Sequence, residues 1–311
     1  LMDVNTGEVL VSASAPTFDP NKFDPGISAS DWEMLSNHPR NPLINKSISG
    51  QYPPGSTFKM MVALAALEAG VITPKSRIHC SGHIEFGDMK FHCWKNKFGH
   101  GNVNIYDAIS QSCDVFFYEI ALKTGINNIA RISREFGLGN VTGLNLPGER
   151  TGLIPDRDWK LKAKNLMWRP GETIIAGIGQ GYVLVTPIQL ALMTARIANG
   201  GKKIVPTLLK SSSKLVHDFP NANVSEKNIN VIKKSMEKVS LGELGTGRNF
   251  RLGIKGIEMA GKTGTVQVRR ISTQERESVD GVIKNEDRPW GWRDHAIYVG
   301  YAPMKNPKYS I

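Results

Sequence analysis

Long apolar runs are missing from this sequence of 311 residues. A membrane-spanning helix needs roughly 18 consecutive apolar residues, and the best candidate, from Met60 to Leu67, is followed by Glu68. The sequence also holds no internal repeat and no segment that resembles a secretory signal peptide. These absences argue against a membrane span or a repeat array within the chain.

Cysteine is scarce, and negative charge is outnumbered. The three cysteines, Cys80, Cys93 and Cys113, are an odd number, so disulfides alone cannot satisfy them all. Lys and Arg total 39 against 28 Asp and Glu, which gives a net charge of +11. The basic residues are scattered, without interleaved aromatics or a nucleic-acid motif. We therefore interpret them as a solvated surface and expect no nucleic-acid partner.

The order of secondary-structure signals predicts an α+β fold. Strand patterns stand at both ends of the chain, at Leu1–Val4 and Glu8–Ser14 and again at Ile257–Val268 and Ala296–Tyr301. Between them the signals from 56 to about 200 are mainly helical. The terminal segments are thus expected to pair in one antiparallel sheet packed with helices, beside a mainly helical subdomain.

Turn and cap residues refine the boundaries of these elements. The segment Pro16–Ser49 is rich in Pro, Asn, Asp and Ser, which predicts a loop, and a charged loop is expected from Arg269 to Arg293. A capping box at Thr186 to Gln189 opens one of the predicted helices. The predicted helices span 56–68, 104–112, 115–123, 126–136, 187–197 and 225–240.

We predict two subdomains, a sheet subdomain from residues 1–55 and 241–311 and a mainly helical one from residues 56–240. Both ends of the chain interrupt a strand-like pattern. We therefore expect an excised piece of a longer protein, with any anchor or targeting segment outside it.

The sequence Ser56, Thr57, Phe58, Lys59 opens a strongly helical stretch and places a hydroxyl and an amine one helical turn apart. A serine becomes nucleophilic when a neighbouring base takes its proton, and a lysine can do so only when burial or a nearby cation keeps it neutral. The amides at a helix start can also hold an oxyanion. Taken by itself, however, this motif occurs by chance in many chains, and a Ser at a helix start is usually only a cap.

Two further motifs favour a catalytic interpretation. Ser112, Cys113, Asp114 lies at the junction of two predicted helices, and Lys262, Thr263, Gly264, Thr265 lies inside a predicted strand. The order S-x-x-K, S-x-N or S-x-D, then K-T-G, is the signature of penicillin-recognising serine acyltransferases. Strand alternation directs Lys262 towards the Ser112 loop and the two threonines the other way.

With these motifs the chain resembles the transpeptidase domain of class B penicillin-binding proteins, most closely the elongation-specific type. The resemblance extends over the whole chain. Its supporting stretches are Tyr52–Lys59, Gly177–Gln189, Ala260–Gln267 and His295–Pro303. Many relatives have Asn where this chain has Asp114; an acid there opposes a neutral Lys59 unless it is engaged elsewhere, although the elongation-specific type is similar in having Asp.

The resemblance implies a D,D-transpeptidase that cross-links peptidoglycan stem peptides and is acylated by β-lactams. It makes Ser56 the nucleophile, Lys59 the general base assisted by Lys262, and Ser112 the proton relay. Asp114 would hydrogen-bond the substrate or Lys59. The implied substrate-binding residues are Thr263, Gly264 and Thr265, with the Ser56 and Thr265 amides as oxyanion hole and Gly264 leaving room for the substrate.

Cys80, Cys93, His100 and Cys113 form a possible metal-binding set, with separations of 13, 7 and 13 residues that match no zinc ribbon or finger. Three unrelated buried cysteines remain an alternative on the residues alone. The resemblance implies a structural zinc ion here, which would fix the loop of Ser112 and Asp114. His79, His83 and His92 are rival ligands; His100 is preferred because it lies in a Gly-His-Gly turn.

Rival functions remain open from the sequence. A serine β-lactamase or a β-lactam sensor domain shares the first and third motifs, and a non-enzymatic zinc module that binds an anionic polymer would explain the charge and the Cys/His set. The resemblance further implies a parent protein at the periplasmic face of the bacterial inner membrane, with an N-terminal transmembrane anchor and a pedestal outside this chain. It also implies partners in a membrane glycan polymerase and other elongation-complex proteins.

Overall fold

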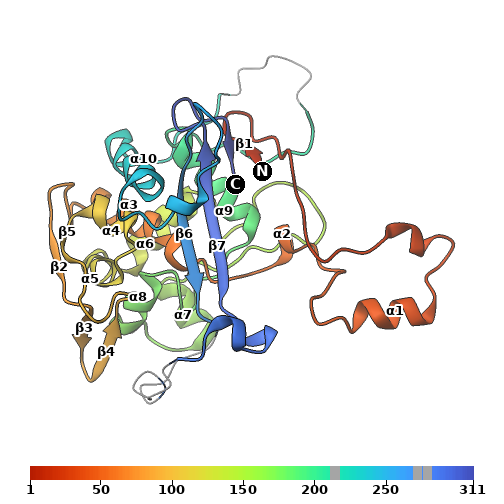
Figure 1. Ribbon diagram of the computed structural model, residues 1–311, viewed down its shortest axis with the longest axis horizontal. Helices are drawn as coiled ribbons and strands as arrows, with labels where there is room; N and C mark the ends of the chain where they lie inside the picture. Colours follow the sequence, from red (N-terminus) through yellow and green to blue (C-terminus); the bar gives the residue numbers. More distant parts are fainter. Residues whose placement is uncertain (211–217, 269–274, 276–281) are drawn as a thin grey trace.

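An antiparallel sheet joins the two ends of the chain (Figure 1). The computed structural model describes residues 1–210, 218–268, 275 and 282–311. Strand β1 (Met2–Asp3) pairs with β8 (Tyr309–Ser310), β8 with β7 (His295–Ala302), and β7 with β6 (Ala260–Val266). This confirms the predicted α+β fold, with its sheet built from terminal segments.

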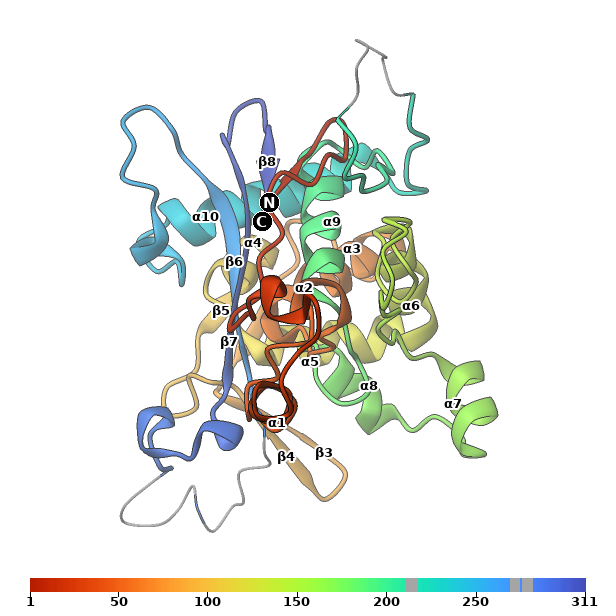
Figure 2. The ribbon, with the colours of Figure 1, turned by 90° about the vertical axis from the view of Figure 1, so that its right-hand side faces the viewer.

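Helices pack against this sheet and form a block beside it. Figure 2 shows β6 and β7 running past α9 (Pro187–Ala198) and α10 (Glu226–Leu241), which contact β7 and β6 respectively. Helix α3 (Lys59–Glu68) lies in the centre of the block, where every residue from Lys59 to Leu67 is buried. A helix that is buried on all sides needs apolar residues on all sides, which explains the unbroken apolar run from Met60 to Leu67.

Most predicted helices are present close to their predicted bounds. The capping box that opens α9 makes both of its hydrogen bonds, Thr186 N to Gln189 Oε1 and Gln189 N to Thr186 Oγ1. Between α3 and α9 lie five further helices, α4 (Ile105–Ser110), α5 (Asp114–Thr124), α6 (Ile126–Glu135), α7 (Arg157–Lys164) and α8 (Pro170–Ala176). No described helix is long and apolar enough to cross a membrane.

The N-terminal segments differ from the prediction. The strand expected over Glu8–Ser14 is wrong: Glu8 and Val9 form only isolated bridges, and the amides of Leu10 and Val11 both turn back to the Leu1 carbonyl, so no ladder continues. The predicted loop 16–49 contains regular structure. Its first part forms an arm that extends from the body in Figure 1 and carries η1 (Pro20–Phe23) and α1 (Ala29–Ser36, capped by Ser28), and its last part, α2 (Lys46–Ser49), packs against α9 in the body.

Two small hairpin-like sheets interrupt the region predicted to be mainly helical. Strand β2 (Ile78–Cys80) pairs with β5 (Gly101–Val103), and β3 (His83–Phe86) pairs with β4 (Met89–His92). Strands of three or four residues carry too little alternation to be recognised in a sequence. They enclose the segment that holds most of the Cys/His set.

The connection between β6 and β7 is only partly described. The first part of the charged loop predicted from Arg269 to Arg293 lies largely outside the described residues. Its described end contains the 3₁₀ turns η4 (Asn285–Asp287) and η5 (Trp290–Trp292). The proposed division into two subdomains stays a prediction.

Candidate active site

The first motif lies in a tight turn that glycine makes possible. Ser56 belongs to a 3₁₀ turn, η2 (Gly55–Phe58), that runs directly into α3 at Lys59, so it precedes the α-helix that the sequence predicted it to begin. Gly55 has a φ of +54°, and a Cβ there would meet the Thr265 carbonyl oxygen at 2.8 Å. Only glycine tolerates both conditions, so the turn can press closely against β6.

The Lys59 amine lies in the centre of a buried polar cluster. Its Nζ donates to Ser112 O at 3.0 Å and to Ser112 Oγ at 3.2 Å, and pairs with Asp114 Oδ1 at 2.7 Å. The Ser56 hydroxyl is not among the acceptors of this amine within the described residues. The first and second motifs therefore meet through Lys59.

The second motif occupies a strained loop between α4 and α5. Ser112 has a φ of +56°, a conformation that is uncommon for a residue with a side chain. Such strain costs on the order of 1–3 kcal/mol and persists only where the surroundings enforce it. Here Lys59 and Lys262 both donate to the Ser112 hydroxyl, so the conformation holds this oxygen between two amines.

The third motif adds a second buried amine. Lys262 on β6 is fully buried, and its Nζ lies 3.1 Å from Ser112 Oγ and 2.8 Å from Thr263 O. Burial, followed by the nearby charge of Lys59, holds the pKa of Lys262 well below its ordinary value. The side chain points to the Ser112 loop, as strand alternation predicts.

The three residues that follow Lys262 on β6 differ in burial and packing, which the sequence did not predict. Thr263 is half-buried and Thr265 exposed. A Cβ on Gly264 would lie 3.2 Å from Pro54 O and from Thr57 Cγ2. The missing side chain therefore lets β6 pack on η2, rather than making room for a substrate as the sequence indicated. The turn that contains Ser56 therefore lies against the part of β6 that contains Thr265, and the oxyanion hole formed by their amides stays a prediction.

Asp114 is engaged with both of its oxygens. Oδ1 pairs with Lys59, and Oδ2 accepts from the Trp94 amide at 2.8 Å. Burial raises the pKa of Asp114, while the charge of Lys59 opposes the shift. The sequence did not single out Trp94, whose indole also donates to Gln111 O at 3.0 Å.

The four Cys/His residues come together. One ligand atom from each of Cys80, Cys93, His100 and Cys113 lies within 4.8 Å of the others. His100 Nδ1 is 3.5 Å from Cys80 Sγ and 3.4 Å from Cys93 Sγ, and its buried Nε2 has no hydrogen-bond partner among the described residues. The three cysteines are buried and free of disulfides. Three thiolates and one imidazole at such separations fit a tetrahedral zinc ion.

Hydrogen bonds within the cluster shift the pKa values of its thiols in opposite directions. Hydrogen bonds from Cys113, and then from His100, lower the pKa of Cys80 to about 6 and that of Cys93 further still. Neighbouring thiolates strongly raise the pKa of Cys113. The rival histidines lie elsewhere: His79 contacts Asn102, and the His83 ring lies 6.1 Å from that of His92.

The Cys/His cluster and the second motif are joined through one residue of the chain. Cys113 stands between Ser112 and Asp114, and the Asp114 amide donates to Cys93 Sγ at 3.3 Å. The cluster thus fixes the loop on which two of the candidate catalytic side chains stand.

Comparisons with known proteins agree with this geometry. Residues 1–311 match the family described as penicillin binding protein transpeptidase domain. The chain is 37% identical over its full length to the peptidoglycan D,D-transpeptidase MrdA of Acinetobacter baumannii and covers 46% of that protein. Over 99% of its length it is 34% identical to MrdA of Escherichia coli K12 and covers 49% of it. The chain therefore spans about half the length of these curated relatives.

Solved structures show the same fold. The chain superimposes over 99% of its length on penicillin-binding protein PBP2 of Helicobacter pylori in complex with MreC, with a TM-score of 0.88 and 37% identity, and covers 54% of that chain. It matches PBP2 of Pseudomonas aeruginosa in complex with WCK 5153 with a TM-score of 0.85 and 38% identity, covering 99% of this chain and 66% of the other.

Proposed function

The chain belongs to the family of penicillin-binding protein transpeptidase domains and is similar to its PBP2 members, and from this we propose that it is a peptidoglycan D,D-transpeptidase. The observation that carries the proposal is the buried cluster in which Lys59, Ser112, Asp114 and Lys262 meet beside Ser56. Two buried lysine amines that converge on one serine hydroxyl do not stabilise a core, because burying each amine costs free energy.

The proposed reaction has two halves. Ser56 Oγ attacks the carbonyl carbon of the penultimate D-Ala of a stem peptide, Lys59 takes its proton, and the oxyanion accepts hydrogen bonds from the Ser56 and Thr265 amides. The carbon–nitrogen bond then breaks, Ser112 passes a proton to the departing D-Ala amine, and an acyl ester remains on Ser56. An amine of a second stem peptide attacks this ester, forms the cross-link, and the proton returns to Ser56 Oγ.

The two amines divide this work unequally. Asp114 pairs with Lys59 in the described state, so the base must release its ion pair, or hand its proton onward, before it can accept one from Ser56. Lys262 is the amine whose pKa burial lowers well below its ordinary value, and Ser112 Oγ lies within hydrogen-bond distance of both amines. We propose that Ser112 exchanges protons with both, which lets Lys59 act as the base despite Asp114.

Covalent labelling tests the proposal. The chain is incubated with a fluorescent penicillin, and the labelled band is followed over time after excess unlabelled drug is added. A label that persists on the wild type and is absent from Ser56→Ala supports the transpeptidase. Rapid release would identify the β-lactamase alternative, and equal labelling of Ser56→Ala would refute Ser56 as the nucleophile.

We also propose that Cys80, Cys93, His100 and Cys113 bind one structural zinc ion. The fit rests on the four convergent ligand atoms and on the buried His100 ring. Zinc bound there would supply structural cross-linking and no step of the reaction. Metal analysis of the purified chain is expected to give about one zinc per chain, and cobalt substitution is expected to give the absorption of a tetrahedral thiolate site. Retention of stoichiometric zinc by Cys93→Ser with Cys113→Ser would refute the site.

The setting of the parent protein is a proposal as well. We propose a longer parent protein, because the chain covers about half of its curated relatives, and we propose that it is anchored in the inner membrane with this domain facing the periplasm. Solved relatives were studied with MreC and in a peptidoglycan synthase complex, so a glycan polymerase and elongation-complex proteins are the proposed partners, reached through regions outside this chain. Co-purification of the full-length parent with such partners, compared with this chain alone, tests the assignment.

A further inference from the structure

Helix α7 and the turn that joins it to α8 form a basic surface that takes no part in the reaction described above. In Figure 2, α7 projects from the body on the side away from α10. Four cationic side chains of this segment are exposed and form no ion pair within the described part of the chain: Arg157, Lys162, Lys164 and Arg169. The only acid between 157 and 169 that could offset them is Asp158. We call these four residues, together with the exposed Leu161, Leu166 and Met167, the α7 surface.

Buried contacts fix the turn that carries the apolar part of this surface. Lys160 is buried and pairs with Glu172 on α8, and its Nζ also donates to Met167 O at 2.9 Å. The Met167 side chain is nevertheless 82% exposed, and that of Leu166 is 56% exposed. An exposed apolar patch rimmed by polar residues marks an interaction surface. The fold therefore presents these side chains to a ligand in a fixed arrangement.

The α7 surface is connected to the turn of Ser56 through the segment after α8. The Tyr182 ring lies 5.2 Å from the ring of Trp159 on α7. Three residues before Tyr182, Gly179 O accepts a hydrogen bond from the Gly55 amide at 2.9 Å. Three residues span at most about 11 Å. A long substrate can therefore reach Ser56 while another part of it rests on α7.

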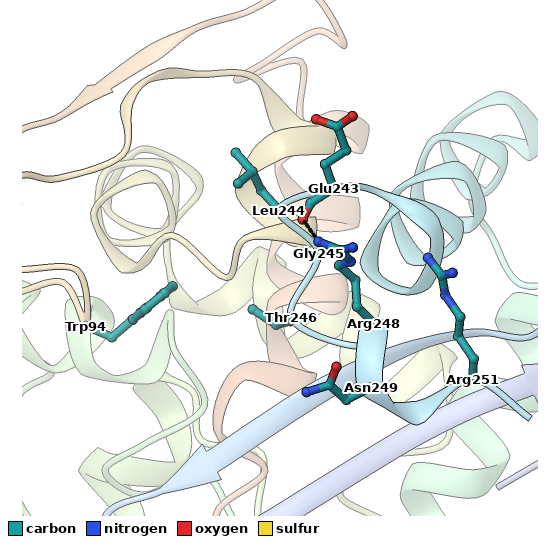
Figure 3. Close-up of a pocket in the computed structure, with 8 residues that line it drawn as sticks. All are labelled: Trp94, Glu243, Leu244, Gly245, Thr246, Arg248, Asn249 and Arg251. Carbon is teal, nitrogen blue, oxygen red and sulfur yellow. Dashed lines mark hydrogen bonds between the residues drawn. The ribbon is translucent and has the colours of Figure 1, made fainter.

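The pocket at the catalytic cluster is built from other segments. It has a volume of about 470 Å³, and its walls are Trp94 and residues between 243 and 251, among them Thr246 and Arg248 (Figure 3). Thr246 Oγ1 accepts a hydrogen bond from Thr263 at 2.8 Å, so this pocket adjoins the third motif. None of its lining residues belongs to α7 or α8. A small compound can therefore react at Ser56 without touching the α7 surface.

The order of residues on α7 indicates which kind of ligand fits. Leu161 lies between Arg157, one turn before it, and Lys164, one turn after it. A helix that lies in a membrane interface keeps its apolar and basic faces apart, whereas on α7 the two kinds of residue are interleaved. Such a surface suits a polymer that alternates carboxylates with apolar groups. Peptidoglycan has this chemistry, because its stem peptides carry carboxylates between methyl groups and sugar rings.

We propose that the α7 surface binds a peptidoglycan strand and holds it beside Ser56. Lys162 and Lys164 attract carboxylates of the stem peptides, and Leu161 and Met167 contact the apolar parts of the strand. The inference rests on the proposed function for the identity of the polymer. It does not depend on the reaction itself, because the strand is held by groups outside the reacting site.

Binding to peptidoglycan after the nucleophile is blocked isolates this surface. The chain is acylated to completion with a penicillin, as verified by intact mass, and is then sedimented with purified insoluble peptidoglycan at low and high salt. Phosphatidylglycerol vesicles are tested in parallel. The variants are Lys162→Gln with Lys164→Gln, and Lys162→Arg with Lys164→Arg. The matched control is Lys227→Gln with Lys234→Gln, which removes two exposed lysines from α10, and thermal melts verify that each protein is folded.

The glutamine pair on α7 is expected to bind peptidoglycan about tenfold more weakly at low salt, because each exposed ion pair changes an affinity by about threefold. The arginine pair and the α10 control should bind within about twofold of the wild type. High salt should shrink the loss, since exposed charges are screened. Penicillin should acylate all four proteins at similar rates, because the α7 surface lies outside the reacting site.

Equal binding by the wild type and the α7 glutamine pair overturns the inference, and so does an equal loss in the α10 control. Both results leave the proposed function intact, because acylation is verified separately. Binding to the vesicles in place of peptidoglycan overturns the inference in favour of a lipid surface. A wild type that penicillin does not acylate refutes the proposed function, and the choice of polymer with it.

Discussion

Lys262→Met tests whether burial keeps the Lys262 amine uncharged. Lys262 is fully buried, and within the described residues no carboxylate lies in hydrogen-bond contact with its Nζ. The folded chain therefore holds the amine with a pKa well below 10.5, the value of a solvated lysine. At any pH between the folded and the unfolded value, the unfolded chain binds a proton that the folded chain does not.

The sign and size of the effect follow from this difference in bound protons. Stability rises with pH wherever the unfolded state binds more protons, so Lys262 makes the wild type more stable as the pH rises towards 10.5. One proton corresponds to about 1.4 kcal/mol per pH unit. From pH 7 to pH 9 the wild type is expected to gain up to about 2.7 kcal/mol relative to Lys262→Met, which lacks the titrating group.

Urea unfolding of both proteins at several values between pH 7 and pH 9 measures this difference. The slope against pH is the readout, because the variant also loses hydrogen bonds to Ser112 Oγ and Thr263 O, which shifts its stability by a constant amount. Val266→Ala, which changes a buried apolar residue on the same strand, should keep the wild-type slope. Parallel curves for the wild type and Lys262→Met would refute the argument that the buried amine is neutral.

Three further perturbations probe the site and its scaffold. Gly55→Ala introduces a Cβ at 2.8 Å from Thr265 O at a positive φ, so it should lower stability by about 1–3 kcal/mol and slow penicillin acylation, whereas Gly26→Ala, with open space around its Cβ position, should change neither. Thr186→Ala removes the N-cap of α9 and should cost about 1 kcal/mol in urea unfolding without changing the acylation rate at saturating drug. A strong chelator should lower the melting temperature of the wild type but not that of a Cys93→Ser variant shown to be metal-free; an unchanged wild-type melt after verified metal loss would contradict a stabilising ion.

The parts of the fold that the sequence predicts are those with strong local signals. Helix α9 has a complete capping box, and β6 and β7 combine alternation with length, so each lies near its predicted bounds. The strand expected after Gly7 fails because its partners are decided by distant segments, and within the described residues it forms two isolated bridges, Val9 to Met2 and Glu8 to Thr207. Local propensity cannot report such a partner.

In the candidate site, too, local motifs were predicted from the sequence, and contacts that depend on the packing of distant segments were not. The sequence motifs identify which side chains converge, since each of Lys59, Ser112 and Lys262 is found in one cluster. The resemblance left open whether Asp114 binds the substrate or Lys59; the pairing with Lys59 depends on how α3 and α5 pack. Trp94 and Thr246 were missed for a similar reason: a single Trp or Thr has no spacing signal, and their importance arises from contacts with Asp114 and Thr263.

The pairing of β1 with β8 has a consequence for synthesis on the ribosome. Met2 lies opposite Ser310, and Lys262 reaches Ser112 only when β6 is held in the sheet by β7. In a nascent chain, Ser56 leaves the ribosome before β6 and β7 do. Until these strands emerge and pair, the chain lacks the Lys262–Ser112 contact, and we expect its Ser56 to be unreactive. Nascent chains of increasing length should accept a penicillin label only after the residues of β7 have left the exit tunnel. The shortest chain that is labelled then reports the point in synthesis at which this domain completes its fold.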